Sequence, residues 1–259
     1  PYFDLGTAYL SQSGQLYIEA AIASVGRCYD FGPVFRAEKS KTKRHLTEFW
    51  MMDAEGAFIE HEENLQIQEG LVRHVVRYCL EHCAEEFIVL ERDTDKLKKA
   101  DAPFKHYTYD EALKKLHELG SDIKYGEDLG NDDEGLLTKD SAVPVFIEKW
   151  PQNIKPFYMK RDPQNQELVL NDDLIATENG GELIGGSQRE DDIKLLEERI
   201  KAEGLNQADY EWYLDLRRYG SVPHSGFGIG LERTVRWIAG VEHVRECIPF
   251  PRTISRLKP

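Results

Sequence analysis

A basic turn between two strand-like segments constrains this chain more than any other feature. The segments are 35–38 (Phe-Arg-Ala-Glu) and 45–50 (His-Leu-Thr-Glu-Phe-Trp), and four of the six residues between them are Lys or Arg. Alternate side chains of a strand share a face, so Arg36 and Glu38 are predicted to point the same way, with Phe49 on the returning strand. A cation, an acid and an aromatic ring under a positive loop would suit a nucleoside triphosphate. For a hairpin taken alone, a solvated basic turn is the more common explanation.

Alternating glycines further along the chain predict a flat strand that runs into a helix. Gly226, Gly228 and Gly230 leave one strand face open to a planar group, and Glu232 and Arg233 follow at the expected helix start. An arginine there is unfavourable because the helix dipole is positive at that end, which indicates a compensating anion or aromatic plane. The segment is not a P-loop, since no Lys-Ser/Thr pair follows the glycines.

The remaining segments predict one α+β domain on a mainly antiparallel sheet flanked by helices, because no repeat or low-complexity linker divides the chain. Strands are expected at 9–16, 143–147, 157–159, 168–175 and 181–189. Helices are expected at 16–23, at 62–86, from Thr108 with a capping box, at about 191–202 and at 207–217. The acidic, Gly-containing stretch 126–140 is expected to be a loop.

Composition limits the classes of protein and partner. With 47 Asp and Glu against 33 Lys and Arg, the net charge of −14 excludes a general nucleic-acid binder, so an RNA partner needs a local basic patch. A hydrophobic content of 41% excludes a disordered chain. No apolar run approaches the length of a membrane span, and no signal-peptide pattern appears. Four scattered cysteines favour free thiols in a reducing, cytoplasmic location.

Two of these elements resemble motifs 2 and 3 of the class II aminoacyl-tRNA synthetases in sequence, spacing and order. They are the hairpin with its Arg-x-Glu and the Gly-x-Gly-x-Gly-x-Glu-Arg element. Segments 31–38, 45–49, 181–189 and 220–228 resemble the subgroup that charges Asp, Asn and Lys, and within it the bacterial-type asparaginyl enzymes.

The resemblance spans nearly all 259 residues and implies the class II catalytic fold over residues 1–259. It also implies ATP and Mg²⁺, L-asparagine and tRNA(Asn) as ligands, and a homodimer. The family's motif 1 and its N-terminal OB-fold anticodon-binding domain are expected to be absent from this chain.

Roles at the nucleotide end follow from the matching positions. The resemblance implies that Arg36 holds the α-phosphate and the substrate carboxylate, and that Glu38 contacts the nucleotide. Phe49 would stack on one face of the adenine, and Arg233 would cover the other while reaching the γ-phosphate. Further implied ATP contacts are Arg44, His45, Glu182 and Gly230. The implied magnesium ligands are Asp173 and Glu182, with Asp172 as a rival.

Roles at the amino-acid end concern a carboxamide, which needs both a donor and an acceptor. Glu19 would accept from its NH₂ group and Arg189 would donate to its oxygen, while His224 borders the pocket. Ser13 and Gln15 would face the amino-acid backbone, although ordinary helix capping also explains a serine here. Aspartyl enzymes carry a lysine in this segment, and a glutamate in its place would repel aspartate. Glu19 could also be a solvated helix position.

Two alternatives remain open. The first is an aspartate-activating relative, either an aspartyl-tRNA synthetase or a tRNA-independent paralogue that makes asparagine from aspartyl-adenylate and ammonia. The second is a non-catalytic, synthetase-like binding module. Such modules usually lose a motif 2 or motif 3 arginine, whereas Arg36 and Arg233 are both present.

Overall fold

The computed structural model describes residues 4, 6–39 and 42–258, so positions 40 and 41 of the predicted basic turn lie outside the described residues. The strands are β1 (Arg27–Phe35), β2 (Glu48–Ala57), β3 (Lys105–Thr108), β4 (Val145–Glu148), β5 (Arg161–Asp162), β6 (Asn165–Val169), β7 (Asn171–Ala176), β8 (Gly181–Gln188) and β9 (His224–Gly230). The helices are α1 (Gln15–Val25), α2 (His61–His82), α3 (Ala84–Val89), α4 (Thr94–Lys99), α5 (Tyr109–Glu118), α6 (Asn131–Thr138), α7 (Ile193–Ala202), α8 (Glu211–Arg218) and α9 (Leu231–Ala239). Short 3₁₀ turns cover Gln152–Ile154, Gln207–Tyr210 and Val244–Cys247.

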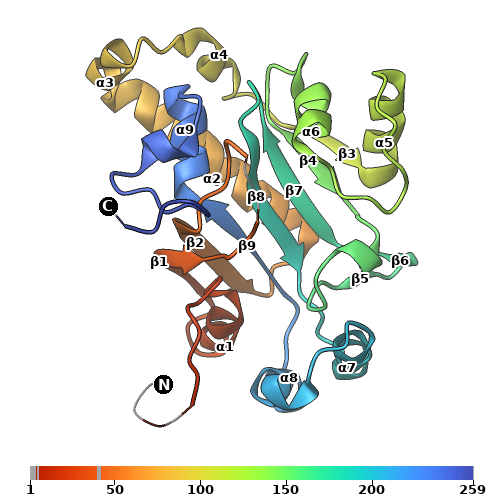
Figure 1. The fold of residues 1–259 in the computed structure, drawn as a ribbon. Coiled ribbons are helices and arrows are strands. Elements are labelled where there is room, and N and C mark those ends of the chain that lie inside the picture. The colour runs from red at the N-terminus through yellow and green to blue at the C-terminus, as the bar shows by residue number, and fades with distance from the viewer. Residues whose placement is uncertain (1–3, 5, 40–41, 259) are drawn as a thin grey trace.

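A seven-stranded sheet in the order β1-β2-β9-β8-β7-β4-β3 forms the centre of the molecule (Figure 1). Its neighbouring strands pair antiparallel except β3 with β4, and β5 and β6 form a separate ribbon. The predicted α+β class with a mainly antiparallel sheet flanked by helices is therefore confirmed. None of the helices in the described ranges is long and apolar enough to cross a membrane.

Helix α2 covers one face of the sheet. Its residues Leu65, Val72 and Val76 recur at helical spacing and pack with Ile184 and Phe227 of the sheet. The opposite face carries α5 and α6 at its β3–β4–β7 edge. Nearer the β1–β2 hairpin this opposite face is open, and it holds the cavity described below.

A bulge in β8 decides which side chains reach that cavity. Leu174 pairs with Ile184, but its neighbour Ile175 pairs with Glu182, so Leu183 is the extra residue. Strict alternation would place Glu182 on the α2 face together with Ile184. The extra residue shifts the alternation, and Glu182 reaches the cavity face.

Several predicted boundaries are wrong. Residues 9–13 form no strand: Tyr9 is 89% exposed, and the segment contacts β1 through a hydrogen bond from the Phe35 backbone N–H to the Ser11 carbonyl, without forming a strand ladder. The helix predicted at 62–86 breaks at Cys83, whose φ of −116° and ψ of 35° are not helical. The acidic stretch contains α6, because Leu137 packs into the core under α5 and acidic residues in its first turn favour the helix dipole.

Two further segments differ. Residues 157–159 form a turn, with one isolated bridge from Met159 to Arg189 in place of a strand. The helix predicted at 207–217 consists of a 3₁₀ turn followed by α8. By contrast, Thr108 and Glu111 form the predicted capping box at the start of α5.

Candidate active site

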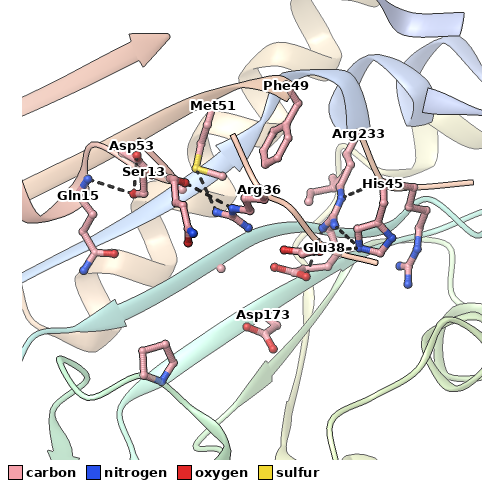
Figure 2. A pocket seen from close by; sticks show the side chains of 18 of the residues that line it. Ser13, Gln15, Arg36, Glu38, His45, Phe49, Met51, Asp53, Asp173 and Arg233 are labelled. Carbon is pink, nitrogen blue, oxygen red and sulfur yellow. Dashed lines mark hydrogen bonds and ion pairs between the residues drawn. The ribbon is translucent and has the colours of Figure 1, made fainter. Parts of the chain in front are cut away.

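A cavity of about 660 Å³ lies between the β1–β2 hairpin, the start of α1 and the strands β7, β8 and β9. It gathers predicted site residues from segments far apart in the sequence (Figure 2). Those that line it are Ser13, Gln15, Arg36, Glu38, Arg44, His45, Phe49, Asp173, Glu182, Arg189, Gly230 and Arg233. Glu19, His224 and Asp172 are not among the lining residues.

Arg36 lies in the middle of the cavity, one residue beyond the end of β1 (Figure 2). Its backbone N–H donates to the Thr47 carbonyl at 3.0 Å, which continues the hairpin ladder past the strand. Its guanidinium lies 5.2 Å from the centre of the Phe49 ring, and its Nε donates to the Gln12 carbonyl at 3.4 Å. A cation and an aromatic face are therefore adjacent, as the period-2 pattern predicts.

A second cationic group lies at the start of α9. Arg233 Nη1 donates to the Glu182 carbonyl at 3.0 Å and lies 3.3 Å from its carboxylate, while Nη2 is 3.5 Å from Nε2 of His45. His45 is in turn 3.7 Å from the Glu38 carboxylate. Burial and the Arg233 charge lower the pKa of His45. The Glu182 carboxylate compensates the positive charge of Arg233, which lies at the positive end of the α9 dipole.

Asp173 and Glu182 converge over Gly185. A Cβ at Gly185 would lie 3.3 Å from Oε1 of Glu182 and 3.8 Å from Oδ1 of Asp173, so the missing side chain keeps the space between the carboxylates open. Burial raises the pKa of Asp173 to about 7, although the Lys155 ammonium 2.6 Å away acts to lower it. Burial also acts on Glu182, but the charges of Arg233 and Lys155 outweigh it and lower its pKa.

Two convergent carboxylates fit a hard divalent cation such as Mg²⁺, which prefers oxygen ligands and retains water. No cluster of three or more His, Cys, Asp or Glu side chains able to hold a metal occurs in the described part of the chain, so phosphate and water oxygens would complete the shell. The rival Asp172 is fully buried and lies against Gln68 of α2, on the other face of the sheet.

The end of the cavity that is predicted to hold the amino acid is organised around Asp53, which is not among the residues predicted from the sequence. Its carboxylate accepts from Ser13 Oγ at 2.9 Å and from the Gly14 backbone N–H at 2.8 Å. Figure 2 shows Ser13, Gln15 and Asp53 grouped at the end of the cavity away from Arg233. Asp53 lies two residues after Met51 and four after Phe49, so the period-2 pattern of β2 contained the signal.

Comparison with known proteins gives the family. A family model described as tRNA synthetases class II (D, K and N) matches residues 1–254. The chain belongs to this family. It is also similar to the asparaginyl-tRNA synthetase of Pyrococcus horikoshii complexed with asparaginyl-adenylate, with 48% identity and a TM-score of 0.97 over 100% of this chain and 59% of that one.

Two solved structures from Entamoeba histolytica show the same fold. Its asparaginyl-tRNA synthetase in complex with asparaginyl-adenylate is 36% identical, with a TM-score of 0.93 over 100% of this chain and 59% of that one. Its aspartyl-tRNA synthetase is 30% identical, with a TM-score of 0.87 over 98% of this chain and 54% of that one. The chain thus spans less than two thirds of the length of each of these synthetases.

Within this synthetase fold, Glu19 lies one layer behind the cavity wall. Its carboxylate accepts from the Tyr213 hydroxyl at 2.6 Å, from Arg217 at 2.8 Å and from Gln15 at 3.0 Å, and it lies 3.0 Å from Nε2 of His224. Burial alone would raise the pKa of Glu19, but the His224 hydrogen bond and the Arg217 charge lower it. Glu19 is therefore not a solvated helix position, and it reaches the cavity through Gln15.

Arg189 lines the cavity between two carboxylates. Its Nε donates to Glu55 at 2.8 Å and lies 4.0 Å from Glu19, and its Nη1 donates to Ser187 at 2.6 Å. Burial raises the pKa of Glu55 to about 7, against the opposing charge of Arg189. The arginine predicted to meet the amino-acid side chain is thus already neutralised by acids of the synthetase itself.

Arg44 lines the cavity, but its guanidinium is paired. Both terminal nitrogens donate to Glu134 of α6, and both side chains are largely buried. The ion pair occupies both terminal nitrogens of this guanidinium, and the role of Arg44 in phosphate binding stays a prediction. Lys155, which is paired with Asp173, also lines the cavity and had no signal in the sequence.

Proposed function

We propose that this chain activates L-asparagine with ATP to form asparaginyl-adenylate and pyrophosphate, and then transfers asparagine to the 3′ end of tRNA(Asn). The observation that carries the proposal is the charge balance around Arg189, which lies between Glu55 and Glu19. Two solved relatives with this fold are complexed with asparaginyl-adenylate, which supports the same substrate here.

Discrimination between asparagine and aspartate follows from that balance. A substrate carboxylate would bring a further negative charge to a cluster in which Glu19 and Glu55 already balance the guanidiniums of Arg189 and Arg217, and burying an unpaired charge is costly. A carboxamide is neutral, and it can both accept from Arg189 and donate to an oxygen acceptor. The segment Ser13–Glu19 contains no lysine that would favour an acidic side chain.

Activation needs alignment more than proton transfer. The substrate carboxylate, ionised at neutral pH, forms a bond to the α-phosphorus of ATP as the bond from that phosphorus to the pyrophosphate oxygen breaks. Arg36 would stabilise the negative charge that grows on the α-phosphate, and Arg233 and His45 would hold the phosphate tail. Phe49 would support the adenine. Asp173 and Glu182 would hold Mg²⁺, which neutralises phosphate charge.

The second step uses the same site. A ribose hydroxyl of the tRNA attacks the carbonyl carbon of the adenylate, and AMP and a proton leave. The exposed Lys39 and Lys43 lie in the turn between β1 and β2. Lys39 offers positive charge for RNA phosphates, and Lys43 would exchange its surface ion pair with Glu242 for such a contact. A homodimer belongs to this proposal, as does a cytoplasmic location, with which four free cysteines agree.

ATP–pyrophosphate exchange tests the proposal when asparagine, aspartate and lysine are compared in parallel on the same preparation. Exchange driven by asparagine, at a rate at least about 100-fold above that with aspartate, is the expected result, since each factor of ten needs only about 1.4 kcal/mol. If aspartate drives the exchange instead, the substrate of this protein is aspartate and not asparagine. Exchange with none of the three, together with retained ATP binding, would favour a binding module.

A further inference from the structure

Resting on this proposed function, we propose that Glu134 is a positioning residue that fastens the base of the β1–β2 loop to the ATP-binding floor. Glu134 lies on α6, in the acidic stretch that the sequence pattern predicts to be a loop. Its side chain is 9% exposed, and that of its partner Arg44 is 8% exposed. The pair therefore lies inside the molecule, although Arg44 is in sequence the last residue of a basic turn.

One carboxylate connects three segments. Glu134 accepts from both terminal nitrogens of Arg44, and Oε2 also accepts from the backbone N–H of Glu182 on β8 at 3.1 Å. The Arg44 carbonyl in turn accepts from Arg233 Nε on α9 at 3.4 Å. Glu134 thus joins the loop to the floor strand directly, and the Arg44 carbonyl extends this connection to the motif 3 helix.

The packing around Arg44 leaves its guanidinium little freedom. A Cβ placed on Gly181 would lie 2.0 Å from Nη1 of Arg44, so the guanidinium rests directly on the backbone of this glycine. Gly181 has φ +76°, a conformation that favours glycine on its own account. Both features hold Arg44 where its carbonyl meets Arg233 and where its neighbour His45 enters the cavity.

The Arg44–Glu134 pair fixes the positions of neighbouring groups and adds little to the electrostatic potential of the cavity. Its two charges cancel, so Arg44 adds little to the attraction of phosphates. Buried ion pairs are also no better for stability, in general, than well-packed apolar residues of the same volume. What the pair supplies is a fixed position for two groups that face the phosphate tail, and catalysis by charge depends on such fixed positions.

The first experiment measures exchange kinetics in Glu134→Gln. The amide keeps the volume of the side chain but removes the charge opposite Arg44, so the loop base loosens. We expect the KM for ATP to rise about tenfold, with the KM for asparagine unchanged, because Asp53 and Ser13 lie at the other end of the cavity. Asp132→Asn is the matched control, since this exposed residue lies in the same helical turn and is expected to match the wild type.

A double variant separates positioning from simple stability. Glu134→Gln with Arg44→Met removes both buried charges and keeps a side-chain oxygen that can accept from the Glu182 backbone N–H, so thermal stability is expected to return close to that of the wild type. If Glu134 positions the loop, the KM for ATP stays raised in this stable protein. A double variant with wild-type stability and wild-type KM for ATP would overturn the proposal.

A third readout needs no activity. Trypsin can cleave the ligand-free protein after Lys39 or the exposed Lys43, and a loosened loop base is expected to accelerate this cleavage severalfold in Glu134→Gln but not in Asp132→Asn. If the wild type exchanges with none of the amino acids, the proposed function fails while this comparison still decides the positioning role. Equal cleavage rates in both variants and the wild type would refute it.

Discussion

The two ends of the cavity both contain acidic and basic side chains, but these are buried at one end and partly exposed to solvent at the other. At the end proposed to bind the amino acid, the side chains of Glu19 and Arg217 are at most 1% exposed and already paired with each other. At the end proposed to bind the phosphates, Glu38 is 51% exposed, His45 27% and Arg233 23%. The closed end is complete before a substrate arrives, whereas the open end keeps charge within reach of solvent.

The difference follows from what each end has to recognise. An amino-acid side chain brings little charge, so it is selected by donors and acceptors whose positions must be fixed beforehand. ATP brings several negative charges, so cations that stay accessible to solvent attract it, while the buried Arg44–Glu134 pair beneath them fixes where they lie. Substitutions at the closed end are therefore expected to act on stability, and substitutions at the open end on catalysis.

The largest effect is expected at the open end. Arg36→Ala removes the cation beside the reacting phosphate, and we expect exchange to fall by about 10³-fold. The unfolding free energy is expected to change by less than about 0.5 kcal/mol, because the contacts of this side chain within the described residues are long, to Gln12, Phe49 and Met51. Arg27→Ala on the exposed part of β1 is the control, and normal exchange in Arg36→Ala would contradict its catalytic role.

The closed end is tested by Arg217→Met, a substitution of similar volume. It leaves the Glu19 carboxylate buried without its main counter-charge, so the unfolding free energy measured by urea denaturation is expected to fall by about 3 kcal/mol. The neighbouring Arg218→Met removes an arginine that is 38% exposed and is expected to cost less than about 1 kcal/mol. Equal losses in the two variants would show that the closed end is no more dependent on pairing than the surface.

How far the sequence predicts these two ends depends on the distance over which each pattern acts. The hairpin and the Gly226–Gly230 strand could be predicted because alternation is a local pattern. Gly228 and Gly230 line the cavity together with the hairpin residues, whereas Gly226 lies against Glu55. Asp53 could have been found by following the alternation of β2 two residues past Met51. The sequence marked Glu19 as a candidate site residue, but it could not predict that Glu19 is buried behind the cavity wall. That burial depends on Tyr213 and Arg217, which lie nearly 200 positions away.

Other features have no local signal at all. The pair of Arg44 with Glu134 joins residues 90 positions apart, and nothing around Glu134 marks it among its acidic neighbours. Glu182 faces the cavity only because Leu183 is bulged, and a bulge reverses the face that simple alternation assigns. Asp172 and Asp173 are adjacent and chemically identical, so only the strand pairing decides which of them lies toward the cavity.

Glu148, on the other face of the sheet, has one buried and one exposed partner, and it therefore allows buried and exposed pairing to be compared at a single carboxylate. Glu148 lies 3.1 Å from the buried His61 and 2.6 Å from His106, which is 44% exposed. Burial raises its pKa, but the hydrogen bonds with His106 and His61 outweigh this and lower it to about 2, from the usual 4.5. The hydrogen bond with Glu148 raises the pKa of His106.

The signs of these shifts define a pH window. Stabilisation by Glu148 is complete above pH 4.5 and is lost as the pH falls toward 2, while that by His106 is complete below pH 6.5 and is lost as the pH rises through its raised pKa. We expect the wild type to lose about 2 kcal/mol more than Glu148→Gln between pH 4.5 and 2.5, measured by urea denaturation at each pH. Parallel curves for the two proteins would contradict the pairing, and the exposed Glu81→Gln serves as control.

The smallest effect tests the apolar wall of the open end. Phe49→Leu keeps an apolar side chain beside Arg36 but removes the flat ring, and stacking of a base on an aromatic ring contributes about 1–3 kcal/mol. We expect the KM for ATP to rise about tenfold, which corresponds to about 1.4 kcal/mol, with stability and the KM for asparagine unchanged. Phe49→Trp is expected to stay near the wild type, and Phe31→Leu, at an exposed position on β1, controls for loss of a ring elsewhere. If Phe49→Leu instead destabilised the fold as much as Arg217→Met does, the open end would be as preorganised as the closed one, and the contrast between them would fail.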